Sequence, residues 1–312
     1  MNFRIITLVI FLLSVTGFAQ NLPKVASGRI TRIENFKSQY VVARNVDVWL
    51  PDGYEATKKY SVVYMHDGQM LFDSTQTWNR KEWGVDETFS RLIKEGKIDP
   101  CIIVAIWNTG SNRISEYFPN KIFAQLENKT QSTFTGKYTG GKPADGDNYL
   151  KFVVTELKSY VDQHFSTYPD KDHTFMMGSS LGATISLYAI NEYPEIFGAV
   201  ACLSTAWLSS IEPNYEIPAA TFEYLKHHFA SAAGHRIYMD YGTGESDKNY
   251  ELTQSFVDLI AKGKGFGDSN YMSKVFDKDE HNEVAWSKRL HVPVEFLMGK
   301  TSVQKASSGK TN

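Results

Sequence analysis

The pentapeptide Gly-Ser-Ser-Leu-Gly at residues 178–182 constrains the fold of this chain more than any other feature. It follows a short apolar run at residues 174–177 and opens the helix-like stretch 181–191, which is rich in small and apolar residues. A sharp turn from strand to helix holds its central residue in a strained backbone conformation, and flanking glycines avoid collisions with the neighbouring strand and helix. The pattern therefore predicts a nucleophile elbow with Ser180 at its tip and Ser179 as a bystander.

Strand and helix signals alternate along the rest of the chain. Short apolar runs that are typical of buried, mostly parallel strands recur at residues 60–65, 101–107, 174–177, 199–203 and 236–241. Stretches with helical patterning lie between them, at residues 85–95, 148–165, 181–191 and 252–262. Residues 28–36 and 40–50 have the pattern of an opening pair of antiparallel strands. This alternation predicts an α/β fold with a mostly parallel, doubly wound sheet and helices on both of its faces.

The first residues have the pattern of a signal peptide. One positive charge, at Arg4, precedes an apolar run of about a dozen residues, which is shorter than the roughly 20 residues that a membrane-spanning helix needs. Small residues at Gly17 and Ala19 predict that residues 1–19 are removed and that the protein is exported to the periplasm or secreted. No cysteine follows the run, so we expect a soluble mature protein without a lipid or membrane anchor.

The rest of the chain has neither an internal repeat nor a long linker. We therefore expect one domain over residues 20–298, followed by a polar, disordered tail at 299–312. The stretch 112–147 is rich in Thr, Gly, Lys and Asn and has no clear periodicity. Long connections of this kind are usually functional or mobile, so this one is either a substrate-facing loop beside the site or a surface excursion without a role.

Charge, aromatic content and cysteines restrict the functional classes. A formal net charge of −2 provides no basic excess to neutralise a phosphate backbone, which argues against nucleic acid as a partner. Aromatic residues make up 13% of the chain, which suits either carbohydrate or aryl substrates or a large core. Cys101 and Cys202 lie in strand-like runs that are not neighbours in the predicted sheet, so we expect two buried free thiols.

The elbow requires an acid and a base further along the chain. An α/β-hydrolase orders its triad as Ser, acid and His, with the last two in loops after later strands. The strand at 236–241 runs into a glycine-containing loop with Glu245 and Asp247, and residues 271–276 lead to a loop with His281. We predict His281 as the general base and Asp247 as its acid, with Glu245 as the second choice, because the shorter carboxylate can reach beneath the imidazole.

The remaining histidines do not suggest another site. They precede the nucleophile, fall in helix-like stretches, precede strands or belong to the closing apolar segment. No pair of them has the spacing of a metal site, so we do not expect hydrolysis by a bound metal.

Two backbone amides are predicted to form the oxyanion hole. Leu181 follows the nucleophile and supplies the first amide. In the loop after the strand at 60–65, Gly68 would let the chain bend so that the Gln69 amide points into the site. The Met70 amide is the alternative second donor.

Several motifs resemble those of the esterase D and enterochelin esterase-like family, which also includes feruloyl and acetyl-xylan esterases of carbohydrate esterase family 1. They are residues 48–51 with Tyr54, residues 64–69, the elbow at Ser180, residues 241–247, and His281 followed by Trp286. The resemblance covers most of the chain after the signal peptide. It implies an α/β-hydrolase fold without a cap domain, ester hydrolysis through an acyl-enzyme and no cofactor, and it supports Asp247 as the acid.

Aromatic residues in or near the loops after early strands are candidate substrate contacts, namely Trp78, Trp83, Trp107 and Tyr117. Each could stack on a sugar or an aryl group or could instead belong to the core. The sequence thus predicts a secreted serine esterase that acts on a small-molecule or oligosaccharide ester, such as an acyl group on carbohydrate. The alternatives are a siderophore lactone esterase, an acyltransferase with the same triad, and a non-catalytic carbohydrate-binding protein. The sequence does not predict the oligomeric state.

Overall fold

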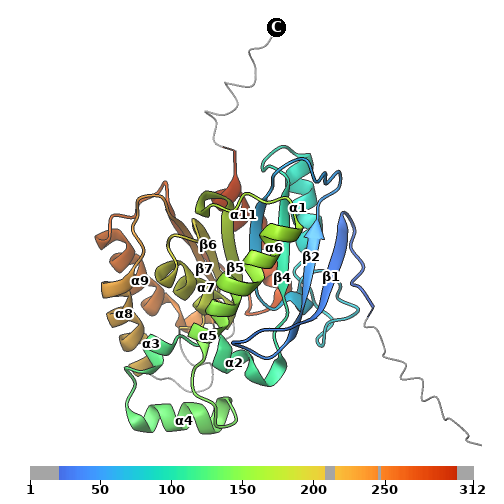
Figure 1. The fold of residues 1–312 in the computed structure, drawn as a ribbon. Helices are drawn as coiled ribbons and strands as arrows, with labels where there is room; N and C mark the ends of the chain where they lie inside the picture. The colour runs from blue at the N-terminus through green and yellow to red at the C-terminus, as the bar shows by residue number, and fades with distance from the viewer. Residues whose placement is uncertain (1–20, 208–214, 245–246, 301–312) are drawn as a thin grey trace, which may run out of the picture.

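The computed structural model describes residues 21–207, 215–244 and 247–300, in which helices pack on both faces of one sheet (Figure 1). The eight strands follow the order β1-β2-β4-β3-β5-β6-β7-β8. The β1–β2 and β2–β4 pairs are antiparallel and all other neighbours are parallel, which confirms the predicted fold class. The strands are β1 (Arg29–Phe36), β2 (Arg44–Leu50), β3 (Ser61–Met65), β4 (Cys101–Ile106), β5 (Thr174–Ser179), β6 (Ala199–Leu203), β7 (Arg236–Gly242) and β8 (Tyr271–Phe276).

The central strands are apolar because both faces of the sheet are covered. On β3, Val62 and Tyr64 belong to one hydrophobic core, whereas Val63 and Met65 belong to the other. Successive side chains of a strand point to opposite faces, so a strand that is buried on both faces has a continuous apolar sequence. The predicted central strands are therefore confirmed, with ends within two residues of those observed.

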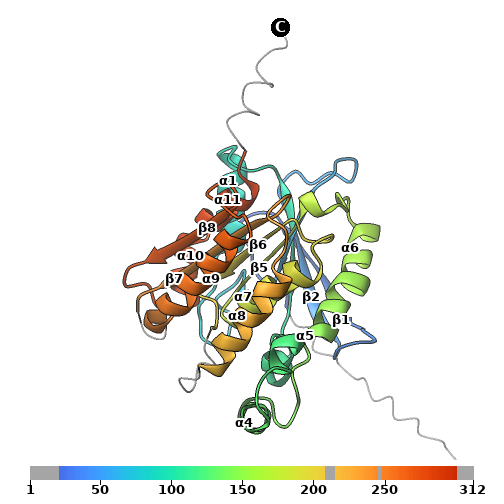
Figure 2. The same ribbon diagram turned by 90° about the vertical axis from the view of Figure 1, so that its left-hand side faces the viewer.

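Two groups of helices cover the two faces, and Figure 2 shows α6 and α1 on opposite sides of the sheet. One face carries α1 (Val85–Lys94), α10 (Glu283–Arg289) and α11 (His291–Met298). The other carries α5 (Gly146–Lys151), a π-helical segment (Phe152–Leu157), α6 (Lys158–His164), α7 (Leu181–Glu192), α8 (Glu216–His228) and α9 (Glu251–Gly263). All four predicted helices are present, and α8, α10 and α11 are additional to them.

The stretch 112–147 is not the long irregular loop that its composition predicts. It contains α2 (Arg113–Glu116), α3 (Asn120–Phe123) and α4 (Asn128–Tyr138). Only Phe134 of α4 is buried, and its ring packs on Phe118 and Phe123. A helix held by a single buried side chain has no apolar stripe, which is why periodicity did not reveal it.

The first two residues of the predicted C-terminal tail are part of the folded domain. Residues 299 and 300 are not part of a free tail, because Gly299 pairs with Ile98 and the Lys300 N–H donates to the Lys97 carbonyl. The predicted signal peptide and residues 301–312 lie outside the described residues.

Cys101 and Cys202 are buried free thiols on β4 and β6, as predicted. Among the described residues, no helix has the length and apolar character to cross a membrane.

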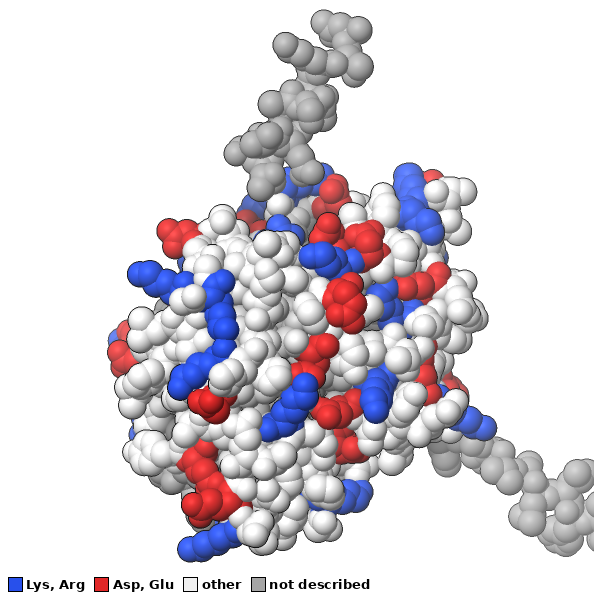
Figure 3. All heavy atoms as spheres, turned by 60° about the vertical axis from the view of Figure 1, so that its left-hand side comes forward, with Lys and Arg blue, Asp and Glu red and all other residues white. Residues whose placement is uncertain are grey.

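Charged side chains of both signs are interspersed on the face in Figure 3, which brings the left-hand side of Figure 1 forward. Neither sign dominates this face. This agrees with the near balance of 33 Lys and Arg against 35 Asp and Glu in the whole chain.

Candidate active site

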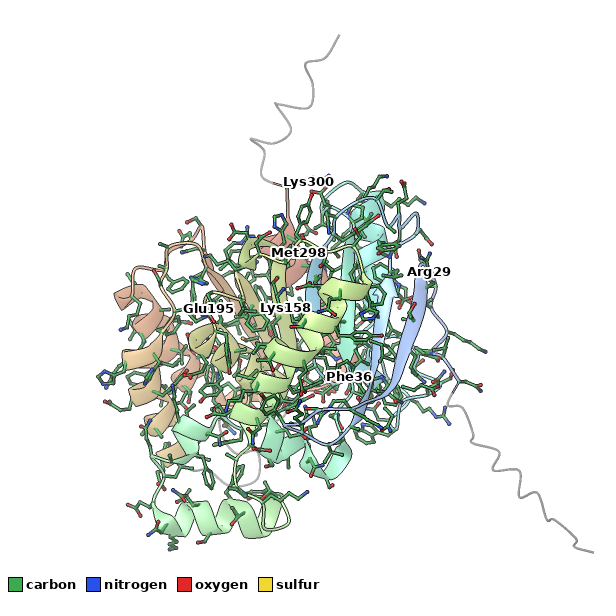
Figure 4. All side chains as sticks on the ribbon, viewed as in Figure 1. Arg29, Phe36, Lys158, Glu195, Met298 and Lys300 are labelled. Atoms are coloured by element: carbon green, nitrogen blue, oxygen red, sulfur yellow. The ribbon has the colours of Figure 1, made fainter. Side chains whose placement is uncertain are left out.

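The candidate residues converge at the carboxyl ends of the parallel strands. Figure 4 labels Arg29 and Phe36 at the two ends of β1, and the parallel strands run from the Arg29 end toward the Phe36 end. Loops that follow β3, β5, β7 and β8 therefore meet at the Phe36 end of the sheet. Ligands of open α/β sheets bind at this end.

Ser180 occupies the strained turn that the pentapeptide predicts. Its backbone has φ 56° and ψ −125°, between the end of β5 and the first residue of α7. A Cβ atom on Gly178 would lie 2.6 Å from the Gly182 backbone, and one on Gly182 would lie 3.2 Å from the Cβ of His66. The glycines are required because the chain and the His66 side chain approach so closely. The structure thus shows the geometry of a nucleophile elbow.

Asp247 and His281 are in direct contact. His281 Nδ1 lies 2.6 Å from Asp247 Oδ1, and Asp247 is fully buried while the His281 side chain is 19% exposed. The other carboxylate oxygen, Oδ2, accepts hydrogen bonds from the Ser204 hydroxyl at 2.5 Å and from the Gly242 N–H at 3.0 Å. Burial alone would raise the pKa of Asp247, but the hydrogen bonds and the charge of His281 outweigh burial and lower it. Glu245, the second choice for the acid, lies outside the described residues.

A buried network that the sequence did not predict supports Asp247. The Ser204 Oγ accepts hydrogen bonds from Trp286 Nε1 at 3.0 Å and from Arg289 Nη2 at 2.9 Å. Arg289 also forms a bidentate ion pair with the buried Asp240. Because both lone pairs of Ser204 are occupied, its single proton points to Asp247. No sequence motif links these residues, which come from β7, α10 and the segments that follow β6 and β7.

The loop after β3 has the position of the second oxyanion donor. The bend lies at Asp67, with φ 56°, and not at Gly68 as predicted. Gly68 is needed for another reason, since a Cβ there would lie 2.6 Å from the Ala105 backbone. The Met70 amide already donates to the Asp67 carbonyl at 2.8 Å, whereas the described residues contain no acceptor for the Gln69 amide. Of these two amides, only that of Gln69 is therefore left to donate to a bound group.

Leu181 has the geometry expected of the first donor. It is the first residue of α7. The first N–H groups of a helix have no partner within the helix, and they carry the positive end of its dipole. An oxyanion beside Ser180 would face these groups.

Ser180 and His281 line one cavity of about 900 Å³, together with Gln69. Trp78, Trp83 and Trp107 also line it, although Trp78 is 83% exposed and Trp83 only 3%. Tyr117 does not line this cavity. It is fully buried and packs on His66 and Tyr149, so its prediction as a substrate contact is wrong.

An ion pair on the cavity wall joins the loop after β3 (residues 66–70, here called the oxyanion loop) to α2. Asp67 accepts two hydrogen bonds from Arg113, from Nε and Nη2, each at 2.7 Å. Asn108 donates a third at 2.8 Å. Burial raises the pKa of Asp67, but Arg113 and Asn108 reverse the effect and lower it. These contacts hold the backbone beside Gln69, and neither partner was predicted from the sequence.

His66 lies beneath the same loop. Its Nδ1 is 2.8 Å from the Tyr149 hydroxyl, and its Nε2 is buried without a partner among the described residues. Burial lowers the pKa of His66 from 6.5 to about 3, so the ring is neutral at physiological pH. The Tyr117 hydroxyl accepts a weak hydrogen bond from the Asp67 N–H at 3.4 Å. The oxyanion loop therefore rests on a buried layer of His66, Tyr117 and Tyr149.

Nothing in the described parts of the chain forms a group of three or more His, Cys, Asp or Glu side chains that could hold a metal ion. The candidate site consists of the triad geometry, the two amides and the cavity.

Comparisons with known proteins identify the family. The model of the family described as "Putative esterase" matches residues 42–297. The uncharacterised protein YbbA of Bacillus subtilis is 21% identical over 266 residues, 82% of this chain and 93% of its own length. An endo-1,4-beta-xylanase/feruloyl esterase of Xylanibacter ruminicola is 24% identical over 193 residues, 57% of this chain and 22% of its own length.

Solved structures of esterases have the same fold. The ferulic acid esterase of Anaeromyces mucronatus has a TM-score of 0.59 at 19% identity, over 88% of this chain and 93% of that one. The enterochelin esterase of Shigella flexneri has a TM-score of 0.64 at 17% identity, over 88% of this chain and 59% of that one. Since the family model spans most of the sequence, this chain belongs to the esterase family described as "Putative esterase" and has an α/β-hydrolase fold.

Proposed function

We propose that this protein is a serine carboxylic ester hydrolase in which Ser180, His281 and Asp247 form the triad. The 2.6 Å contact between Asp247 and His281, on a cavity that Ser180 also lines, is the observation that carries the proposal. Asp247 is buried and its pKa is lowered, so it is ionised and can stabilise an imidazolium.

The proposed reaction has two halves. Ser180 Oγ attacks the ester carbonyl carbon while its proton passes to His281 Nε2, and the Nδ1–H donates to Asp247. The Gln69 and Leu181 amides hold the oxyanion of the tetrahedral intermediate. The imidazolium then protonates the departing alkoxide, which leaves an acyl-enzyme. His281 next takes a proton from a water molecule, which attacks the acyl carbon and forms a second tetrahedral intermediate. As this intermediate collapses, the imidazolium returns the proton to Ser180 Oγ and the carboxylic acid is released.

The substrate we propose is an acyl ester on carbohydrate, of the feruloyl or acetyl type. Two of the similar proteins are named as feruloyl or ferulic acid esterases. The indoles of Trp78 and Trp107 on the cavity wall suit a sugar or an aryl ring. A siderophore lactone is the second candidate, because the enterochelin esterase of Shigella flexneri has the same fold. The signal-peptide pattern supports an exported enzyme that meets either substrate outside the cytoplasm.

One assay tests the reaction class. The protein is expected to hydrolyse short-chain 4-nitrophenyl esters, and Ser180→Ala to abolish turnover. Ser255→Ala on the exposed side of α9 is the matched control, since it makes the same change far from the cavity. Wild-type turnover in Ser180→Ala would refute the triad. Failure of a fluorophosphonate to label Ser180, with polysaccharide binding intact, would favour a non-catalytic binding protein.

A second experiment identifies the substrate. The protein is incubated separately with feruloylated oligosaccharides, acetylated oligosaccharides and a catecholate trilactone. Mass spectrometry then identifies the products. Loss of the acyl group from the oligosaccharide supports the proposal, whereas opening of only the trilactone favours the siderophore esterase. Transfer of the acyl group to a sugar hydroxyl would instead reveal an acyltransferase.

A further inference from the structure

A second cavity, of about 300 Å³, lies at the opposite end of the sheet from Ser180. Phe175 near the start of β5 and Arg236 at the start of β7 line it, so it opens at the amino ends of the parallel strands. Met298 and Lys300 mark this end of the molecule in Figure 4. Neither the triad nor the oxyanion loop reaches this cavity, so the proposed esterase reaction does not use it.

Arg236 differs from the other arginines that are at least partly buried. Four of them each donate two hydrogen bonds to a carboxylate, namely Arg32, Arg44, Arg113 and Arg289. Arg236 is half-buried on the cavity wall, and its guanidinium has no hydrogen-bond or ion-pair partner in the described parts of the chain. Burial lowers its pKa, yet an arginine stays charged in a protein. The guanidinium groups of the other four arginines each bind two carboxylate oxygens, whereas that of Arg236 binds none in the described parts of the chain.

His235 precedes Arg236, and two backbone carbonyls hold its ring. Its Nδ1 lies 2.7 Å from the Ser231 carbonyl oxygen, and its Nε2 lies 2.7 Å from the Pro194 carbonyl oxygen. These two contacts fix the orientation of the ring. His235 is buried and also lines the cavity.

One carboxylate also lines the cavity. Asp172 lines the cavity, but its side chain is 72% exposed and lies 4.0 Å from the Lys171 Nζ. Lys171 also donates to the Gly234 carbonyl at 3.0 Å. The charges of Arg236 on the cavity wall and of the nearby Lys171 thus stand against that of Asp172. The excess is positive.

We propose that this cavity binds a small oxyanion, with Arg236 as a bidentate donor. Carboxylate and phosphate groups both present two oxygens at the spacing of the guanidinium fork. The charges of Arg236 and of the nearby Lys171 favour a negative group, and the volume admits a group of this size. The site is separate from the esterase centre, so the test of this proposal does not depend on the proposed reaction.

Calorimetric titration of the full chain in a chloride buffer tests the site. Inorganic phosphate, sulfate and acetate are the probes, and we expect saturable binding of at least one of them. Tight binding of phosphate and sulfate assigns a tetrahedral oxyanion, and tight binding of acetate assigns a carboxylate. Arg236→Met should weaken binding by about tenfold or more, because a charge-assisted hydrogen-bond pair is lost. Arg91→Met, at an exposed arginine on α1, should bind as the wild type does.

A second measurement covers the case in which Arg236→Met folds poorly. Nuclear magnetic resonance of the wild type during a phosphate titration should show shifts at the Gly198, Gly234 and Asn270 amides, which surround the cavity. Arg236→Lys keeps the charge without the fork, so its affinity should fall between those of the wild type and Arg236→Met. Absence of saturable binding by all three probes, or shifts confined to the cavity of Ser180, would overturn the proposal.

Discussion

The imidazole of His281 and the carboxylate of Asp247 lie 2.6 Å apart, although 34 residues separate them in the chain. β8 carries the chain back alongside β7, so the loops after these two strands meet. Asp247 is fixed from behind by Ser204 and Gly242.

Asp247→Asn should lower kcat by on the order of 10⁴, because the amide keeps the shape of the carboxylate but cannot stabilise the imidazolium. Turnover of 4-nitrophenyl acetate measures the effect. Asp268→Asn, an exposed change outside the network, is the control. Glu245→Gln should matter far less. A larger loss in Glu245→Gln than in Asp247→Asn, with both variants folded by circular dichroism, would make Glu245 the acid.

Ser204→Ala should destabilise the protein by about 1–3 kcal/mol, because it leaves Trp286 Nε1 without its acceptor in a buried site and removes one of the acceptors of Arg289. Urea denaturation gives the change in the free energy of unfolding. Thr205→Val is the matched control, since the buried Thr205 hydroxyl has no partner among the described residues. Equal losses in the two variants would show that the Ser204 network contributes nothing specific.

His66 should make stability depend on pH. Its pKa falls from 6.5 to about 3 on folding, so the unfolded chain takes up the proton first as the pH decreases. The stability from this residue is complete above pH 6.5 and is lost between pH 6.5 and about 3, at about 1.4 kcal/mol per pH unit. Denaturation at pH 7 and pH 5 should show a smaller difference in His66→Gln than in the wild type. His164→Gln, at an exposed position, should keep the wild-type difference.

Tyr149→Phe should lower kcat by about tenfold and change KM little. The change removes the hydroxyl that contacts His66 beneath the loop with the Gln69 amide, and this amide is expected to bind the oxyanion mainly in the transition state. Steady-state kinetics with a 4-nitrophenyl ester separates the two constants. Tyr224→Phe also removes a buried hydroxyl, one that donates to Glu192 far from the loop. If Tyr224→Phe lowered kcat equally, general destabilisation would explain the loss.

Trp78→Ala should raise KM for feruloylated oligosaccharides by about fivefold without altering stability, because the exposed indole can stack on a ring and supports little of the core. Tyr215→Ala removes another exposed ring and should leave KM unchanged. Trp83→Ala should instead cost about 3–5 kcal/mol of stability, since Trp83 is buried against Trp286. An unchanged KM in Trp78→Ala would remove this residue from the substrate site.

Local patterns in the sequence were sufficient for the fold class. The central strands are apolar over a few residues, and the elbow needs glycines that are close in the chain, so both could be recognised from neighbours alone. The position of His281 after the last strand could be predicted in the same way. By contrast, α4 was missed because one buried side chain leaves no periodic signal.

The sequence by itself determined the alternation of strands and helices, the strained turn at Ser180 and the candidate order of the triad. Only the tertiary structure decided that Tyr117 is buried, that Arg113 pairs with Asp67, and that Ser204 orients Asp247. These contacts join residues that are distant in the chain, and their partners depend on which strands become neighbours. The sequence around a carboxylate or a hydroxyl does not identify its partner in the folded protein, because burial and hydrogen bonding arise only when the sheet is assembled.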